Sequence, residues 1–399
     1  MEELTKPGHK ANFLAALLCS AVVLGSLQVQ PGIADTDSLA QLKPKRIVSC
    51  CTLVGLMPRP TLQQTEADQN VSGFVNRTFD YLNAGDYVNA FVESNDALKL
   101  QPKSAVTHYL NGLSLMAMQD YPEATNEFTE ATTTDPTSAE MHFMLGQSYR
   151  LRGQFDKAVA EYNDALKIKP DFASAQAMLG ECARMQGHPM KASSDCNEAM
   201  RIAPQFPLPH TILANMYLLQ GKTTESCTEY EAAINLAPDD PYAHFRYGQS
   251  LGSLKRWSEA EFELRKAIKL DPLYTDAYMV LGWVLVSQER FSDALPILKR
   301  GVALQPNDVD AHNALAQLYI RTGDHDSAVT EYKVARRLRP KSLRIQRALA
   351  LELAQTQNLD EAIVELSLTL QQYPLGDEEL KLHLNALLQL KNKERLLNE

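Results

Sequence analysis

The sequence lacks the motifs by which most enzymes are recognised. It contains no Gly-rich phosphate loop, no Gly-X-Ser-X-Gly element and no paired-carboxylate motif. Every Gly and nearly every His instead has a structural place in one repeated pattern, and the residues outside that pattern are too few to build a catalytic domain. We therefore expect a protein that is not an enzyme and that binds no cofactor.

The sequence also lacks an excess of basic residues. Lys and Arg total 39 against 49 Asp and Glu, which gives a net charge of −10. Nucleic acids are bound through clusters of cations that neutralise phosphates, so this balance argues against nucleic acid as the main partner. The composition, with 45% hydrophobic and 22% charged residues, is typical of a folded soluble protein rather than a disordered one.

Long apolar runs are scarce, and the one that stands out lies near the N-terminus, at Ala11–Leu27. Two lysines precede it, and the small residues Gly32 and Ala34 follow it, a pattern typical of a secretory signal peptide over residues 1–34 that is cut after Ala34. The alternative is an uncleaved anchor, with residues 11–27 as a membrane tether, because the run is just long enough to span a bilayer. Either interpretation predicts an exported protein, periplasmic or otherwise extracytoplasmic, or anchored to the membrane.

What the sequence does contain is one strict period. Proline recurs every 34 residues, a series with a chance probability on the order of 10⁻¹⁰ at an average proline frequency of ~5%. Three series of small residues, which begin at Gly112, Ala124 and Ala131, keep the same interval and predict two helices that approach closely. Glycines such as Gly153 fall where a left-handed helix end is needed. The prolines are residues 102, 136, 170, 204, 238, 272, 306, 340 and 374.

This pattern resembles the tetratricopeptide repeat, whose signature has Leu-Gly, aromatic, Ala and Pro residues at these intervals. The resemblance implies an all-α protein, a right-handed α-solenoid of stacked helix–turn–helix hairpins. We expect a flexible linker over residues 35–70, nine repeats over 71–376 and a C-terminal capping helix over 377–399. One repeat carries the signature at Leu145, Gly146, Tyr149, Phe155, Ala158, Tyr162, Ala165 and Pro170.

In the family that the chain resembles, partners bind as extended peptides or helices in a concave groove lined by the first helix of each repeat. By that analogy the sequence predicts a groove that mixes aromatic and amide side chains and turns basic toward the C-terminus. The alternative for each of these residues is a place in helix–helix packing. The candidates are Tyr109, Phe143, Gln147, Thr211, Asn215, Phe245, Gln249, Met279, Trp283, Asn313, Gln317, Arg321, Arg344 and Arg347.

The run Lys333–Arg347 has seven basic residues and no acidic one. It is either an anchor for an acidic segment or terminal carboxylate of a partner, or a solvated face with cations near a helix C-terminus. Some family members hold the C-terminal carboxylate of chaperones with a Lys/Asn/Arg clamp. The matching places here are Phe143, Gln147, Met178 and Leu208, which do not form that clamp.

Histidines and cysteines are the remaining candidates for a metal or a disulfide. Five histidines share the fourth place of their repeats, where an amphipathic ring would pack on the neighbouring helix, and none has a Cys or carboxylate at ligand spacing, so we expect no metal. Cys182 and Cys196 lie on the two helices of one repeat, either bonded in an exported protein or, the interpretation we favour, buried as thiols. The five histidines are His108, His142, His210, His244 and His312.

The function that these features favour is a non-catalytic scaffold or adaptor that binds other proteins, in cell-envelope assembly or secretion. The alternative is an accessory subunit that recruits substrates for a separately encoded enzyme, such as a glycosyltransferase or a protease. The repeats also resemble the repeat region of protein O-glycosyltransferases, which favours keeping this alternative.

Overall fold

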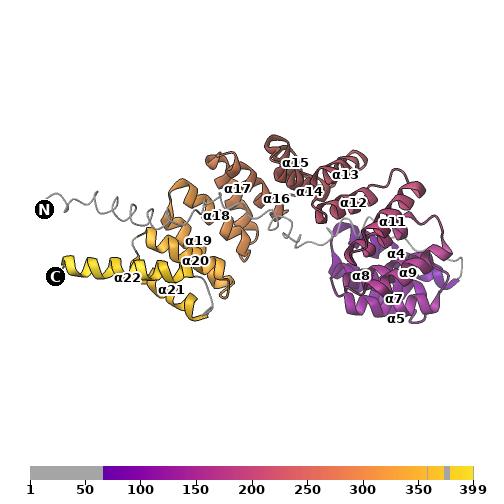
Figure 1. Cartoon of the computed structure of the whole chain (residues 1–399). Helices are drawn as coiled ribbons and strands as arrows, with labels where there is room; N and C mark the ends of the chain where they lie inside the picture. The colour runs from indigo at the N-terminus through magenta and orange to yellow at the C-terminus, as the bar shows by residue number, and fades with distance from the viewer. Residues whose placement is uncertain (1–65, 357, 373–377, 399) are drawn as a thin grey trace. The chain divides into compact units, whose positions relative to one another are not determined.

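The computed structural model describes residues 66–356, 358–372 and 378–398. Over these residues the protein is all-helical, with 19 helices and no strand (Figure 1), as the period predicts. The expected signal peptide or anchor and most of the expected linker lie outside the described residues. The first described helix begins at Glu66, so helical structure starts inside the segment predicted to be a linker. No helix in the described ranges has the length and apolar character needed to cross a membrane.

The described residues divide into two compact units, which we call unit N (residues 66–250) and unit C (residues 251–398). Each unit is a row of helical hairpins, and the division falls inside α14. Unit N contains α4 (Glu66–Ala84), α5 (Tyr87–Leu100), α6 (Ala105–Ala117), α7 (Tyr121–Thr134), α8 (Ala139–Leu151), α9 (Phe155–Ile168), α10 (Ala173–Met185), α11 (Pro189–Ile202), α12 (Leu208–Leu219), α13 (Thr223–Leu236) and most of α14 (Pro241–Ser253).

Unit C continues the same alternation of a first and a second helix. Its last helix, α22, packs on α21, and Leu387 of α22 is buried in the same hydrophobic cluster as Leu349 and Leu366. The helices are α15 (Trp257–Leu270), α16 (Thr275–Ser287), α17 (Phe291–Leu304), α18 (Val309–Thr322), α19 (His325–Leu338), α20 (Leu343–Gln355), α21 (Leu359–Gln372) and α22 (Glu378–Asn398).

Each hairpin is defined at its turn and at its exit. Gly153 has φ +72 between α8 and α9, a left-handed conformation that glycine adopts without a Cβ penalty and that ends the first helix. At the other end, the N–H of Lys169 donates to the carbonyl of Ala165 at 2.8 Å, and Pro170 then stands outside the helix, where its missing N–H is harmless. The periodic prolines therefore separate repeats, as predicted.

The small residues inside the helices allow the two helices of a hairpin to touch. A Cβ added at Gly146 would lie 2.7 Å from the ring of Tyr162, and one at Gly282 would lie 2.2 Å from Leu298. Both distances are shorter than any normal contact, so a larger residue would push the helices apart. The helix pairs α8–α9 and α16–α17 thus need glycine at these positions because of packing, not because of backbone conformation.

Successive first helices also contact one another directly. Such contacts join α4 to α6, α6 to α8 and α10 to α12 in unit N, and α16 to α18 in unit C. First helices therefore crowd together on one side of each unit, which is the inner side of a curved stack of hairpins. The sequence places the predicted partner-binding residues on that inner side.

Candidate partner-binding surface

Three aromatic residues predicted for the groove lie in the hydrophobic core instead. Tyr109, Phe143 and Phe245 are each 0% exposed. The ring of Tyr109 packs on Phe128 with centroids 5.8 Å apart, and Phe143 packs on Tyr162 at 5.7 Å. A side chain with no exposed surface cannot touch a partner, so their assignment to the groove is wrong. The fifth place of the repeat faces the second helix more than it faces the inner surface.

Two further candidates at this place are also buried. Thr211 is 7% exposed and Met279 is 9% exposed. The sulfur of Met279 lies where a Cβ at Gly301 would be, at 2.7 Å, so this side chain fills the gap left by a small residue on the second helix. Among the candidates at the fifth place, Asn313 and Arg347 are half-buried rather than buried.

The ninth place of the repeat forms a polar row in unit N, made of Gln147, Glu181, Asn215 and Gln249 on successive first helices. Gln147 is 1% exposed, and its Oε1 accepts from Tyr162 Oη at 2.9 Å and from Arg150 Nε at 2.8 Å. Gln249 is also buried, and its Oε1 accepts from Arg246 at 2.8 Å. These two amides are therefore used inside the unit to satisfy buried donors.

The accessible residues of the polar row are Glu181 on α10 and Asn215 on α12, and Arg184 of α10 pairs with Glu181. Arg184 donates two hydrogen bonds to Glu181, at 2.8 and 2.7 Å, and these side chains are 14% and 17% exposed. Asn215 is half-buried, and its Oδ1 accepts from Tyr230 Oη at 2.6 Å and from Tyr242 Oη at 3.3 Å. The row thus presents an ion pair beside an amide.

Burial fixes which way these hydrogen bonds run. It raises the pKa of the Tyr162 and Tyr230 hydroxyls far above their ordinary value. Both hydroxyls therefore stay protonated and can donate, and in the structure they donate to the amide oxygens of Gln147 and Asn215. For Asn215 this leaves the Nδ2 group, which donates no hydrogen bond to any described residue.

The predicted groove residues of unit C present an aromatic and a basic surface. Trp283 is half-buried and packs edge-on against Trp257, with ring centroids 5.3 Å apart. Asn313 and Gln317 on α18 are half-buried. Arg321 is exposed, with its guanidinium 5.7 Å from the centre of the Phe291 ring. Arg344 is exposed as well, and Arg347 is half-buried.

Comparisons with known proteins agree with this architecture. The tetratricopeptide repeat matches residues 109–172, 152–205, 251–318 and 285–352, and the TPR repeat matches residues 214–255. Together these matches cover more than half of the chain. The chain belongs to the tetratricopeptide repeat family. Proteins of this family generally act by binding other proteins and are generally not enzymes. A search of curated proteins gave no match.

Several solved structures share the fold of this tetratricopeptide repeat protein. Yeast Tom70 has 17% identity and a TM-score of 0.56, covering 88% of this chain and 79% of its own. The human IFIT1 dimer with PPP-AAAA has 16% identity and a TM-score of 0.56, covering 81% and 83%. The APC/C hetero-tetramer Cut9–Hcn1 has 16% identity and a TM-score of 0.54, covering 73% of this chain but 58% of the other. At these identities the similarity shows the fold alone.

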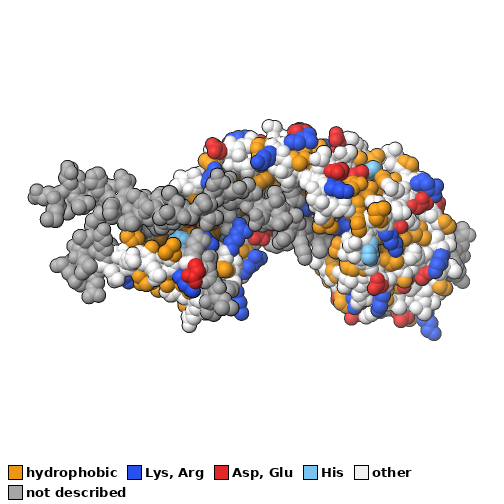
Figure 2. Space-filling model, in the orientation of Figure 1, with side chains coloured by type: hydrophobic (Ala, Val, Ile, Leu, Met, Phe, Trp, Pro, Cys, Tyr) orange, Lys and Arg blue, Asp and Glu red, His pale blue; other side chains and the backbone are white. Residues whose placement is uncertain are grey.

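The basic run Lys333–Arg347 is partly neutralised in the structure. On α19, Lys333 pairs with Glu361 at 2.8 Å and Arg336 pairs with Glu365, both acids lying on the next second helix. The cations border a cavity of about 540 Å³, lined by Lys333, Arg336, Arg337, Pro340, Gln346, Glu361, Glu365 and Leu368. Over the face shown in Figure 2, acidic and basic side chains are interspersed. Two cations of the run thus stabilise repeat packing, and its use as an anchor stays a prediction.

The histidines of the fourth place have partners that the sequence analysis missed. The Nδ1 atoms of His108, His142, His210 and His312 each lie 2.6–2.8 Å from a glutamate 19 residues later, on the second helix of the same hairpin. The available signal was the sequence itself, because every His at this place is followed by Glu at that interval. The statement that no carboxylate stands at ligand spacing is therefore wrong. The glutamates are Glu127, Glu161, Glu229, Glu263 and Glu331.

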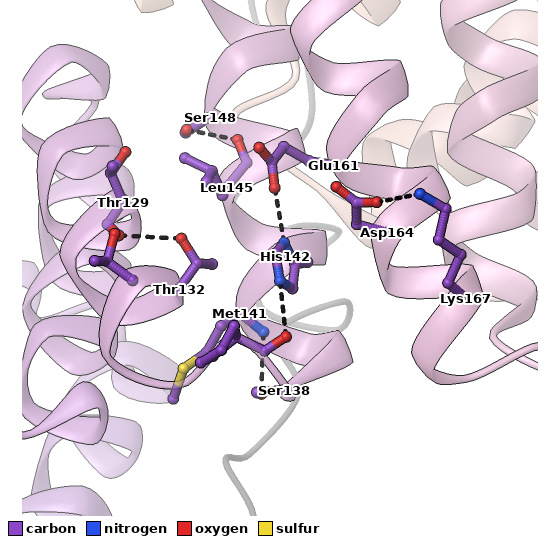
Figure 3. Close-up of polar contacts among 12 residues, drawn as sticks. Thr129, Thr132, Ser138, Met141, His142, Leu145, Ser148, Glu161, Asp164 and Lys167 are labelled. Carbon is purple, nitrogen blue, oxygen red and sulfur yellow. Dashed lines mark hydrogen bonds and ion pairs between the residues drawn. The ribbon is translucent and has the colours of Figure 1, made fainter.

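One of these pairs has a third acidic neighbour that could complete a metal-binding group. Atoms of His142, Glu161 and Asp164 lie within 4.8 Å of one another (Figure 3). However, His142 Nδ1 is 2.8 Å from Glu161, whereas two ligands of one tetrahedral zinc ion are about 3.4 Å apart. Asp164 pairs with Lys167 at 2.7 Å. The spacing is that of hydrogen bonds rather than of an ion held between ligands.

The cysteines of the repeats are buried thiols. Cys182, Cys196 and Cys227 are free and buried, which agrees with the interpretation favoured from the sequence. Burial raises the pKa of Cys182 and of Cys196 to about 12. Because the thiolate is the reactive form, these thiols are unreactive at neutral pH and serve as small core residues.

Proposed function

We propose that this chain is a non-catalytic scaffold that holds extended peptide segments of other proteins along the inner side of unit N. The observation that carries the proposal is the Nδ2 group of Asn215, which donates to no described residue, beside the Glu181–Arg184 ion pair. Amide N–H groups donate to peptide carbonyls, and paired charges offer both signs to the side chains of a bound segment. Such a surface suits a polypeptide that lies extended across successive first helices.

The rest of the proposed contact surface follows from the same geometry. Arg184 is hydrogen-bonded to Glu181 and lies close enough to Tyr230 and Tyr242 to interact with them electrostatically. A fixed guanidinium loses little entropy when it binds a carboxylate. We therefore expect bound segments to carry an acidic side chain near α10 and a free backbone carbonyl near α12.

A selection experiment tests this function without knowledge of the natural partner. A phage-displayed library of random peptides is selected on the purified chain, and the footprint of an enriched peptide is mapped by hydrogen-exchange mass spectrometry. The expected result is enrichment of acidic peptides that protect α10 and α12. Enrichment of peptides that protect only second helices would overturn the proposal.

We also propose that the chain is exported, on the strength of the N-terminal sequence pattern. The proposal places the repeats outside the cytoplasmic membrane, where they act in assembly of the cell envelope or in secretion. N-terminal sequencing of the protein isolated from its native cell tests it. A mature chain that begins at Asp35, or an intact chain in the membrane fraction, supports export, and an intact chain in the cytosolic fraction contradicts it.

A further inference from the structure

Three histidines are held at both ring nitrogens by oxygen atoms. In His142, Nδ1 is 2.8 Å from Glu161 Oε2 and Nε2 is 3.3 Å from the carbonyl oxygen of Pro136 (Figure 3). His108 has the same contacts at 2.7 and 3.1 Å, and His312 has them at 2.6 and 2.9 Å. We call each such set a His–Glu–Pro clamp. It joins the first helix both to the second helix and to the connection that precedes it.

The two hydrogen bonds of a clamp can form only if the clamp holds an additional proton. A backbone carbonyl can only accept a hydrogen bond, and so can an ionised carboxylate, whereas a neutral imidazole has only one N–H. Two acceptors therefore require either a doubly protonated ring or a protonated glutamate. In both cases the clamp binds one proton more than a neutral histidine and an ionised glutamate hold when they are apart.

The chain itself shows that the fold does not need a histidine at this place. Gln176 stands at the same position of another repeat and donates to Asp195 at 3.2 Å. Gln346 donates to the carbonyl of Pro340 at 2.6 Å, and Tyr278 donates to that of Pro272 at 3.1 Å. Each of these residues makes one hydrogen bond of the clamp with a neutral side chain. They supply matched substitutions for a test.

We infer that the His–Glu–Pro clamp at His142 makes the packing of its hairpin depend on a bound proton. While the ring holds this proton, the clamp keeps both of its hydrogen bonds. When the pH rises and the proton leaves, one nitrogen becomes an acceptor facing another acceptor, and the first helix loses one of its two attachments. The clamp therefore weakens its own hairpin as the pH rises.

The charged groups that face these rings support the direction of the effect. His142 faces Glu161 and Asp164 of α9, and the latter pairs with Lys167. Among the described residues, His108 and His312 bond to no charged group other than their own glutamates. The rings are mostly buried, with 7–15% of the side chain exposed. Solvent therefore screens the pairs only partly.

The sign of the pH dependence follows for His142. Its hydrogen bond to Glu161 raises the pKa of the ring above the ordinary value, against an opposing effect of burial. A pKa that is higher in the folded state adds stability that is fully present below the unfolded value of about 6.5 and is lost as the pH rises through the folded value.

Two measurements on the full chain test the inference, both with a chelator present. In the first, urea unfolding is followed from pH 6 to pH 9 for the native chain and for His142→Gln, with exposed His188→Gln as the control. The unfolding equilibrium constants of the native chain and His142→Gln should differ most at pH 6, by roughly tenfold, and converge as the pH rises. The control should follow the native chain. A difference that does not change with pH would overturn the inference.

The second measurement reports the protons on the ring directly. In nitrogen NMR of the chain labelled with ¹⁵N-histidine, the signals of His142 are those that are missing in His142→Gln or, failing that, those that shift in Glu161→Gln. Two protonated ring nitrogens are expected at pH 6, and the second proton should leave above the ordinary histidine value of about 6.5. Loss of that proton at or below the ordinary value, or a protonation that depends on omitting the chelator, would contradict the proton clamp.

Discussion

Units N and C use the same 34-residue repeat but join their repeats differently. In unit N, rings and buried polar groups cross from one hairpin to the next, as in Phe143 against Phe172 at 5.0 Å and Arg246 against Tyr230 at 3.2 Å. In unit C one ring pair, Trp257 with Trp283, also crosses between hairpins, but ion pairs join successive second helices, as in Arg290 with Glu261 at 2.6 Å. The 34-residue period thus specifies the hairpin, whereas the contact between hairpins depends on the particular side chains of each repeat.

The largest expected effect comes from removing a ring of the unit N core. Phe143→Ala leaves a cavity between α8, α9 and the next repeat, and it should lower the free energy of unfolding by about 3–5 kcal/mol. Hydrogen-exchange mass spectrometry should show faster exchange concentrated in α8–α10 rather than in unit C. The control is Phe262→Ala in unit C, whose side chain is 66% exposed and should change stability by less than about 0.5 kcal/mol. Equal effects of the two substitutions would contradict the place of Phe143 in the core of unit N.

Removing an ion pair should have a smaller effect, confined to unit C. Glu365 is 5% exposed and pairs with Arg336 of the preceding repeat. Glu365→Gln leaves a partly buried guanidinium without its charge partner, which should lower stability by about 1–2 kcal/mol. Added salt should weaken unit C more than unit N, because it screens partly exposed pairs such as Arg290–Glu261. Exchange rates at low and high salt measure both effects, and a larger salt response in unit N would contradict them.

The smallest effect concerns the turns inside the hairpins. Five turns have glycine with positive φ, but Gln119, Lys255 and Glu289 hold the same place with φ of 66, 59 and 58. A residue with a Cβ costs roughly 1 kcal/mol there. Glu289→Gly should therefore raise the free energy of unfolding by about 0.5–1 kcal/mol, and Gly323→Ala should lower it by a similar amount. Thermal unfolding of both variants, with opposite shifts expected, checks this.

Much of the fold could be predicted from the sequence because its determinants are local. Proline, glycine and alanine act through backbone geometry and close contact, and each repeats at a fixed interval, so the helix, the turn and the exit could all be expected. The groove was harder to predict. Whether Phe143 faces a partner or a neighbouring ring depends on how one helix is rotated against the next, and residue type does not reveal that rotation.

The sequence predicted which polar residues lie at the ninth place, but not which of them are accessible to a partner. Asn215 does lie at an accessible part of the polar row, whereas Gln147 is enclosed by Tyr162 and Arg150. Both are amides at the same place of their repeats, and they differ only in which large side chains surround them. The pairing of His142 with Glu161, in contrast, was present in the sequence as a fixed interval and needed a search for co-occurring positions rather than for single residues.

The most direct test of the scaffold function is the affinity of a library-selected acidic peptide for Asn215→Ala, measured by fluorescence anisotropy. This substitution removes the Nδ2 donor together with the oxygen that accepts from Tyr230 and Tyr242, and the lost donor should weaken binding by about 3- to 10-fold, the worth of one hydrogen bond. Asn126→Ala, which removes an exposed amide from the second helix α7, is the matched control and should bind like the native chain. Unchanged affinity in Asn215→Ala, or an equal loss in the control, would contradict peptide binding along the first helices of unit N.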